Sequence, residues 1–188
     1  MRINRGSHSL FCLIQGDLSR FHSLLKHDQN LSPRSLSYWL LLFSPRLAPV
    51  FIYRLAHFCH CHRFKTLAKL LTCFNSFMFG IEIACACDIG PGLFIPHSQG
   101  IVIGAWCIGS NFTVFQGVTI GARKLDFDMS PSCRPIISNN VTIGAGAVVI
   151  GNLNLGDNTF VGANSVVLTN IPPNSLAVGA PARVVPQI

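Results

Sequence analysis

One histidine of this 188-residue chain stands apart from the other six. His97 lies in the second half of the chain, whereas the others all precede residue 63. An imidazole gains and loses a proton near neutral pH, so His97 is a candidate general base. Glu82 precedes it by fifteen residues, which in a coil of about 18 residues places the carboxylate almost beneath the imidazole. A carboxylate there fixes the tautomer of the imidazole and raises its basicity, so the pair predicts proton abstraction.

Two other groups of reactive side chains are less convincing. The segment His57-Phe58-Cys59-His60-Cys61-His62 is rich in metal-ligand types. On a helix, however, adjacent side chains diverge and only pairs such as His57 and Cys61 meet. Structural zinc sites use separated ligand pairs, so we expect no metal here and interpret the segment as a helix surface or a subunit contact. Cys133 has no histidine near it in the sequence, which favours a passive thiol over a nucleophile.

The element that must position His97 is a six-residue repeat. Neither an amphipathic helix nor a simple strand has this period. It is typical of a hexapeptide solenoid, in which each repeat is a short strand plus a corner and one aliphatic side chain per strand fills the core. The alternative is a β-sandwich with chance spacing. With one seven-residue step and one long gap, the repeating residues are Ile83, Ile89, Ile95, Ile101, Ile108, Val114, Ile120, Ile137, Ile143, Val149, Leu155, Val161 and Val167.

The chain divides into two predicted domains. Residues 1–80 carry helix signals over 17–26, 35–43, 49–61 and 64–79, with Asp17 as an N-cap and Gly80 as the last stop. Residues 81–188 form the solenoid domain. Its repeat is interrupted at 121–136 and resumes in register, which favours an extruded arm over a passive insertion. Two short strands over 176–179 and 182–185 are expected to cap the open end.

The amino-acid composition restricts the classes of ligand and partner that this protein is expected to bind. The net charge is +7, only 11% of the residues are charged and 49% are hydrophobic, which fits a protein that hides surface in an oligomer and binds an anionic ligand such as a phosphorylated cofactor. No nucleic-acid motif is present. The apolar run 38–53 contains Pro45, Arg46 and Pro49 and is too short for a membrane span. The N-terminus lacks the pattern of a signal peptide, so we expect a cytoplasmic protein with reduced cysteines.

A set of motifs in this chain resembles those of bacterial serine O-acetyltransferases and of their relatives that acetylate exopolysaccharide sugars, the colanic-acid type. The motifs lie at residues 79–83, 94–97, 100–104, 115–121, 143–147, 161–167 and 179–183. The resemblance covers about residues 17–186. It implies a left-handed parallel β-helix, a homotrimer and acetyl-CoA as the donor. The single histidine of the solenoid independently argues against a metal, which would need several ligands.

The resemblance also implies roles for particular residues. In the family a corner histidine is the general base and an acidic residue one coil away holds it, and these positions match His97 and Glu82. The family binds its donor in the groove between subunits through small residues, with a cation as a candidate for the CoA phosphates. The matching positions are Gly121, Ala122, Ala145, Ala163 and Arg183. The acceptor alkoxide then attacks the thioester directly, and a backbone N–H can hold the oxyanion.

The acceptor side departs from the family pattern. Serine enzymes have an acid immediately before the catalytic histidine, where this chain has Pro96. Their arm carries Arg-His-Pro, where this chain has Cys133-Arg134-Pro135. Asp17 matches a serine-contacting acid only weakly. These departures favour, by a small margin, a sugar hydroxyl of a polysaccharide precursor over serine. A non-catalytic binding scaffold is the alternative from another class.

Overall fold

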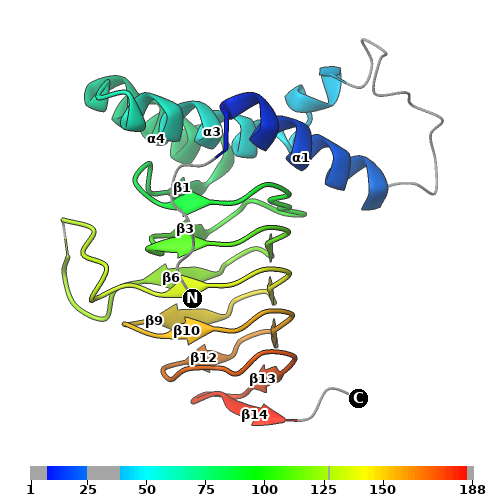
Figure 1. The fold of residues 1–188 in the computed structure, drawn as a ribbon, viewed down its shortest axis with the longest axis vertical. Coiled ribbons are helices and arrows are strands. Elements are labelled where there is room, and N and C mark those ends of the chain that lie inside the picture. The colour runs from blue at the N-terminus through cyan, green and yellow to red at the C-terminus, as the bar shows by residue number, and fades with distance from the viewer. Residues whose placement is uncertain (1–7, 25–38, 127, 186–188) are drawn as a thin grey trace.

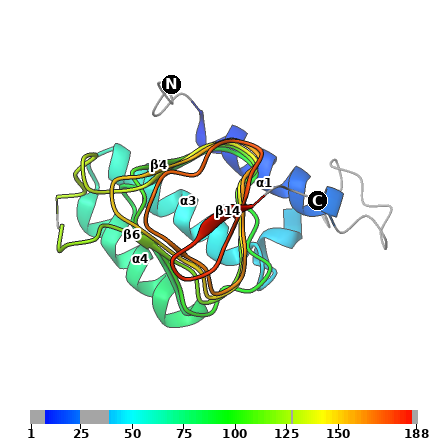
Figure 2. The same ribbon diagram turned by 90° about the horizontal axis from the view of Figure 1, so that it is seen from below.

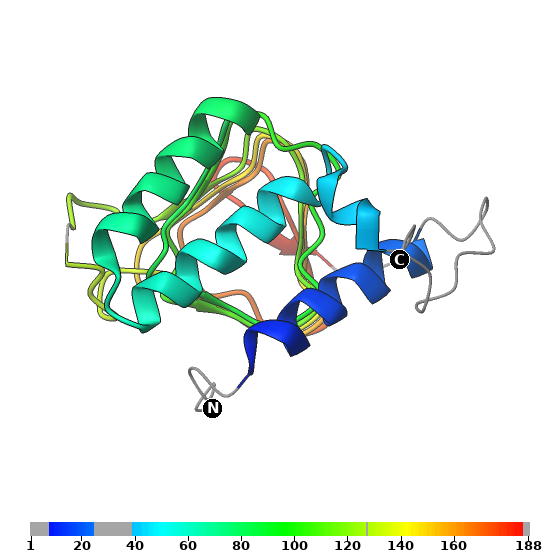
Figure 3. The same cartoon turned by 90° about the horizontal axis from the view of Figure 1, so that it is seen from above.

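The computed structural model describes residues 8–24, 39–126 and 128–185. Its helices all precede its strands, and they cover one end of a stack of coils (Figures 1 and 3). The helices are α1 (Leu10–Leu24), η1 (Leu41–Phe43), α3 (Ala48–Cys61) and α4 (Lys65–Phe79). The strands are β1 (Ile81–Ile83), β2 (Asp88–Ile89), β3 (Ile101–Ile103), β4 (Cys107–Ile108), β5 (Thr113–Val114), β6 (Thr119–Gly121), β7 (Ile136–Ile137), β8 (Thr142–Ile143), β9 (Val148–Ile150), β10 (Asn154–Leu155), β11 (Phe160–Val161), β12 (Val166–Val167), β13 (Leu176–Val178) and β14 (Arg183–Val185).

The strands form the three faces of a triangular prism, which is plain when the molecule is viewed along its axis (Figure 2). Sheet A has the order β1-β3-β6-β9-β12, sheet B β10-β7-β4-β2, and sheet C β14-β13-β11-β8-β5. The chain visits A, B and C in turn, and neighbouring strands are parallel except for the final β13–β14 pair. This is the predicted β-helix. The arm over 121–136 projects from it between β6 and β7 (Figure 1).

The core is a set of stacked aliphatic columns. Every one of the thirteen repeating residues is buried, with at most 2% of its surface exposed. The corner between sheets B and C closes tightly because Asn111, Asn140 and Asn158 adopt left-handed φ angles of 57–58°. Asparagine tolerates that region because its side chain bonds locally. Here the amides also form a ladder: Asn111 donates to Asn140 at 3.1 Å, and Asn140 to Asn158 at 3.0 Å.

The helical part confirms α3, α4 and the stop at Gly80, which has a left-handed φ of 63°. The prediction for α1 was wrong at its start, because the helix begins at Leu10 and Asp17 lies in its middle, buried. The predicted helix over 35–43 falls partly outside the described residues, and its last three residues form the short η1 turn. None of the described helices is long and apolar enough to cross a bilayer.

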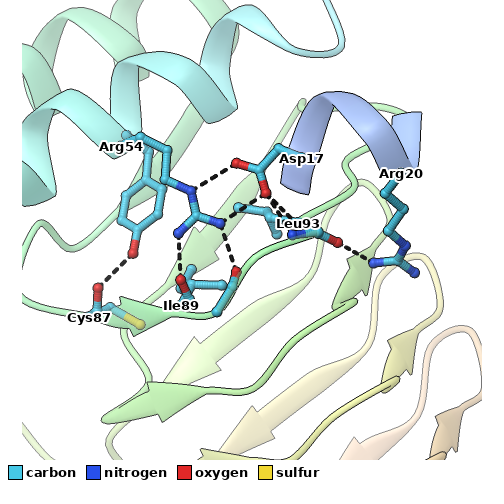
Figure 4. A network of polar contacts seen from close by, with 9 residues as sticks. Asp17, Arg20, Arg54, Cys87, Ile89 and Leu93 are labelled. Carbon is cyan, nitrogen blue, oxygen red and sulfur yellow. Dashed lines mark hydrogen bonds and ion pairs between the residues drawn. The ribbon is translucent and has the colours of Figure 1, made fainter. Parts of the chain in front are cut away.

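A buried ion pair seats the helices on the first coil (Figure 4). Arg54 of α3 donates to both carboxylate oxygens of Asp17, at 2.9 and 3.0 Å. The same guanidinium donates to the carbonyls of Ile89 and Gly90, and the Asp17 carboxylate accepts the N–H groups of Gly92 and Leu93. Burial disfavours the charged guanidinium, but the Asp17 carboxylate outweighs this and raises the pKa of Arg54. Backbone groups of the turn that leads from sheet B to sheet C are therefore satisfied by the helices.

Candidate active site

His97 lies at the corner between sheets C and A, where the coil is longer than its neighbours. Phe94 and Val102 pair with Thr113 and Thr119 of the next coil. Phe94 and Val102 are eight residues apart, whereas their partners Thr113 and Thr119 are only six residues apart. The corner therefore holds two extra residues, and His97 is exposed on it. The added length lifts the imidazole away from the regular coil.

This insertion corrects the repeat assigned from the sequence. Ile101 pairs with Ile81, while Ile103 is the residue that aligns with Ile83 and Ile120 in sheet A. The step across the His97 corner is thus eight residues, from Ile95 to Ile103, and the step after it, from Ile103 to Ile108, is five residues rather than seven. Ile101 and Ile103 are both buried, so burial pattern alone could not distinguish them.

Glu82 does not lie beneath His97 as predicted. The first coil takes 20 residues from Ile81 to Ile101, rather than about 18, so Glu82 pairs with Val102 on the outer face of sheet A. The His97 corner nevertheless rests on the start of β1, since Gly100 N–H donates to the Gly80 carbonyl at 2.8 Å. Within the described residues no hydrogen bond or ion pair joins the Glu82 carboxylate to the imidazole.

Glu82 lines a cleft of about 900 Å³ between α4, the first two coils and the arm. The cleft is ringed by charges that the sequence did not single out, namely Lys65 and Lys69 of α4 and Asp128 of the arm. Trp106 gives it an apolar wall. A carboxylate and two ammonium groups facing one cleft suit a polar small molecule. No group of three or more metal-ligating side chains converges within the described ranges.

Two of the predicted donor-binding residues lie on the same edge as His97. Asn164 N–H donates to the Ala145 carbonyl at 2.8 Å, Gly146 N–H to the Gln116 carbonyl at 2.9 Å, and Gly117 N–H to the Gln99 carbonyl at 2.9 Å. This ladder places Ala163, Ala145 and Gln116 in successive turns below the His97 corner. The small side chains leave the edge accessible, as an extended ligand along it requires.

Arg183 lies at the far end of that edge. It opens β14 opposite Val178, and the N–H of the preceding Ala182 donates to the Val166 carbonyl of sheet A at 2.8 Å. The guanidinium residue is exposed. His97, Ala145, Ala163 and Arg183 therefore run down one edge of the prism.

Gly121 and Ala122 lie on the opposite edge of sheet A, where the arm leaves the coil. The Gly121 carbonyl accepts Gly151 N–H at 2.9 Å. Beside them is a recess of about 410 Å³ whose lining includes Arg123 and Lys124. The structure thus does not bring these two residues together with His97 inside one chain.

Arg134 holds the arm to the coil. Its Nε donates to Asp126 at 2.7 Å and its Nη1 to the Gly104 carbonyl at 2.7 Å. Burial raises the pKa of Asp126, but hydrogen bonds from Arg134 and from Ser130 N–H lower it by more, so the pKa is below its usual value. At neutral pH the pair is charged and Arg134 is engaged within the arm. Arg134 is therefore not free to bind the carboxylate of an acceptor. Asp17 is buried against Arg54 and cannot contact an acceptor either.

A triangular prism built from six-residue turns, with an exposed imidazole at one lengthened corner, defines the class of hexapeptide-repeat transferases. Residues 134–169 match the family model described as "Bacterial transferase hexapeptide (six repeats)". The chain is 40% identical over 155 residues to the serine acetyltransferase of Helicobacter pylori strain J99, covering 81% of this chain and 89% of that protein. It is 39% identical over 161 residues to the Bacillus subtilis serine acetyltransferase, covering 85% and 72%. The chain belongs to the serine acetyltransferase family, and it is an acyltransferase.

Solved structures agree with this assignment. Serine acetyltransferase from Neisseria gonorrhoeae superposes with a TM-score of 0.79 at 30% identity, covering 94% of this chain and 64% of that one. The enzyme from Brucella abortus in complex with coenzyme A gives a TM-score of 0.78 at 29% identity, covering 93% and 67%. The chain therefore spans about two thirds of the length of these solved chains. The predicted left-handed parallel β-helix preceded by helices is confirmed.

Proposed function

We propose that this protein transfers the acetyl group of acetyl-CoA to the hydroxyl of L-serine. The observation that carries the proposal is the exposed imidazole of His97 on a lengthened corner, above an edge of small residues, in a chain of the serine acetyltransferase family. A non-catalytic scaffold is not favoured, because the curated relatives and solved neighbours carry the names of enzymes. The eight cysteines, all of which are described, are free thiols. We propose a cytoplasmic protein, as the sequence pattern suggests.

The chemistry follows from one base. His97 takes the proton of the serine hydroxyl while the hydroxyl oxygen attacks the thioester carbonyl. This attack forms a tetrahedral intermediate. When this intermediate collapses, the C–S bond breaks and the imidazolium returns the proton to the CoA thiolate. Glu82 makes no direct contact with His97 within one chain, so its proposed contribution is a longer-range electrostatic stabilisation of the imidazolium. No acyl-enzyme is required.

We propose that the donor lies in a groove between protomers of a homotrimer. Ala145 and Ala163 would face the pantetheine chain on one protomer, with Arg183 near the phosphates. Gly121 and Ala122, which lie on the other edge of sheet A, would come from the neighbouring protomer. A groove with one edge from each protomer accounts for why the five residues are split between two edges. The net charge of +7 favours such an anionic donor.

For the acceptor, the comparisons outweigh the preference for a sugar that the sequence suggested. The gonococcal and soybean serine acetyltransferases have been solved in complex with serine. Pro96 and Arg134 still distinguish this chain from the expected serine-binding pattern. Because Arg134 is engaged by Asp126 and Gly104, we do not assign it to the serine carboxylate.

Release of free CoA in the presence of candidate acceptors tests this proposal. We expect L-serine to raise the rate of CoA release by about tenfold or more over the acceptor-free rate, with O-acetylserine identified by mass spectrometry, since a bound hydroxyl replaces slow attack by water. Glycine, which lacks the hydroxyl, is the matched control and leaves the rate unchanged. Stimulation by a nucleotide sugar but not by serine would reassign the acceptor to a sugar. If neither serine nor a nucleotide sugar stimulated the reaction and the protein did not bind CoA, the result would favour a non-catalytic binding scaffold.

A further inference from the structure

A second imidazole is poised against a thiol, on the side of the prism opposite the His97 corner. The Nδ1 atom of His57 lies 2.9 Å from the Cys85 carbonyl. A carbonyl only accepts hydrogen bonds, so Nδ1 carries a hydrogen and the lone pair of the neutral ring is on Nε2. That nitrogen lies 3.5 Å from Cys61 Sγ, one turn further along α3.

An acidic group completes the arrangement. Asp88 of β2 places Oδ1 3.9 Å from His57 Nε2, where it stabilises the ring when it becomes charged. The side chains of His57 and Asp88 are 13% and 21% exposed, whereas Cys61 is exposed. A nucleophile, a base with a fixed tautomer and a carboxylate beside that base are the parts of an activated thiol.

A pocket of about 350 Å³ opens at this thiol. Side chains of α1, α3 and the first coil line it, among them Leu13, Arg54 and Phe58 together with Cys61. Its walls come from α1, α3 and sheet B, whereas His97 is at the corner where sheets C and A meet. A group attached to Cys61 would therefore occupy this pocket without reaching the proposed acetyl-transfer site.

We propose that Cys61 is a base-assisted nucleophile and a modification site for low-molecular-weight disulfides. His57 Nε2 takes the thiol proton, and the Cys61 sulfur attacks one sulfur of the disulfide. A bond forms between Cys61 and that sulfur, the original S–S bond breaks, and the departing thiolate takes up the proton from His57. One mixed disulfide and one small thiol are the products, so no oxidant beyond the disulfide is needed.

The other thiols provide the contrast. Cys85 also approaches an imidazole, with Sγ 3.6 Å from His60 Nδ1, but burial raises the pKa of Cys85 and holds it in the unreactive thiol form. Cys12 and Cys133 are exposed, and neither contacts an imidazole among the described residues. These three therefore serve as internal controls within one folded protein.

The groups facing His57 set the pH range of this chemistry. Burial lowers the pKa of His57, which the Cys85 carbonyl and Asp88 partly oppose, while Arg54 and His60 lower it further. His8 and His62 also line the pocket. The ring is therefore neutral and able to accept a proton at pH 7, and the Cys61 rate falls only as the pH drops through the lowered pKa, below about 6.5.

Glutathione disulfide, with peptide mapping of the mixed disulfides after acid quenching, tests the proposal on the full chain. At pH 7 we expect Cys61 to react about tenfold or more faster than Cys12 and Cys133. His57→Gln brings it to their rate, while His62→Gln, the matched control, leaves it fast. Equal rates of modification at Cys61 and Cys133 in the wild-type protein would overturn the proposal without the need for a variant. An unchanged rate at Cys61 in His57→Gln would also overturn it.

A Cys61→Ser variant separates this inference from the proposed acetyl transfer. We expect it to lose the fast adduct and to keep the acetyltransferase rate of the wild type, because the pocket lies away from the His97 corner. A fast adduct that persists in Cys61→Ser would refute the thiol assignment whatever the acceptor assay finds. Failure of L-serine to stimulate CoA release would refute the proposed acetyl transfer and leave the thiol assignment untouched.

Discussion

Replacing His97 with alanine is expected to lower kcat for acetyl transfer by about 10²-fold or more, because the acceptor hydroxyl loses its only proposed base. The side chain is exposed on its corner, so the free energy of unfolding should change by no more than about 0.5 kcal/mol. The KM for acetyl-CoA should stay close to that of the wild type, since the donor is assigned to the edge below. Steady-state CoA release, with thermal unfolding measured in parallel, checks both expectations.

The matched control is Gln99→Ala, an exposed residue of the same corner with no assigned proton transfer. Its kcat should lie within a few-fold of the wild type. Glu82→Gln keeps the shape of the side chain but removes the charge, and it should slow the reaction less than His97→Ala does. An unchanged kcat in His97→Ala would remove the imidazole from the mechanism.

Asp17→Ala is expected to destabilise the protein by about 3–5 kcal/mol, the cost of leaving a buried charge uncompensated. Arg54 and Asp17 are both almost fully buried, and the carboxylate also accepts two backbone N–H groups of the first coil. Its removal leaves the guanidinium and both N–H groups without that acceptor. Urea unfolding followed by circular dichroism measures the loss as a lower midpoint.

Asp128→Ala is the matched control, because this aspartate is exposed and its loss should cost no more than about 0.5 kcal/mol. The double variant Asp17→Leu/Arg54→Met should be more stable than Asp17→Ala, since it removes both charges together. A drop of under about 1 kcal/mol for Asp17→Ala would show that the pair does not seat the helices on the coil.

The solenoid could be predicted because its physical requirement is periodic. Each six-residue repeat must supply one inward aliphatic residue. All thirteen residues assigned to this role from the sequence are buried. Asparagines at the corner between sheets B and C were likewise foreseeable, since few other residues accept a left-handed φ. Asp17 was misread because an acid next to an apolar helix face looks like an N-cap. Its partner, Arg54, is 37 residues away and could not be found from local pattern.

The site was harder to foresee than the coil. Strands β1 and β3 of sheet A each carry two buried residues around one exposed residue, so Ile101 and Ile103 fit the inward pattern equally well. Choosing Ile101 concealed the two extra residues of the His97 corner and placed Glu82 two residues too close to His97. The engagement of Arg134 by Asp126 depends on how the arm folds back, and no repeat specifies that. The cleft at Glu82 likewise unites α4 with the arm, segments that are distant in the sequence.

The position of bound CoA tests the proposed acetyl-transfer site most directly. A crystal structure of the protein with CoA should place the thiol beside the His97 imidazole, with the pantetheine chain along Ala145 and Ala163 and the phosphates near Arg183. CoA bound on another face, with its sulfur remote from His97, would contradict the assignment of this edge as the site of acetyl transfer.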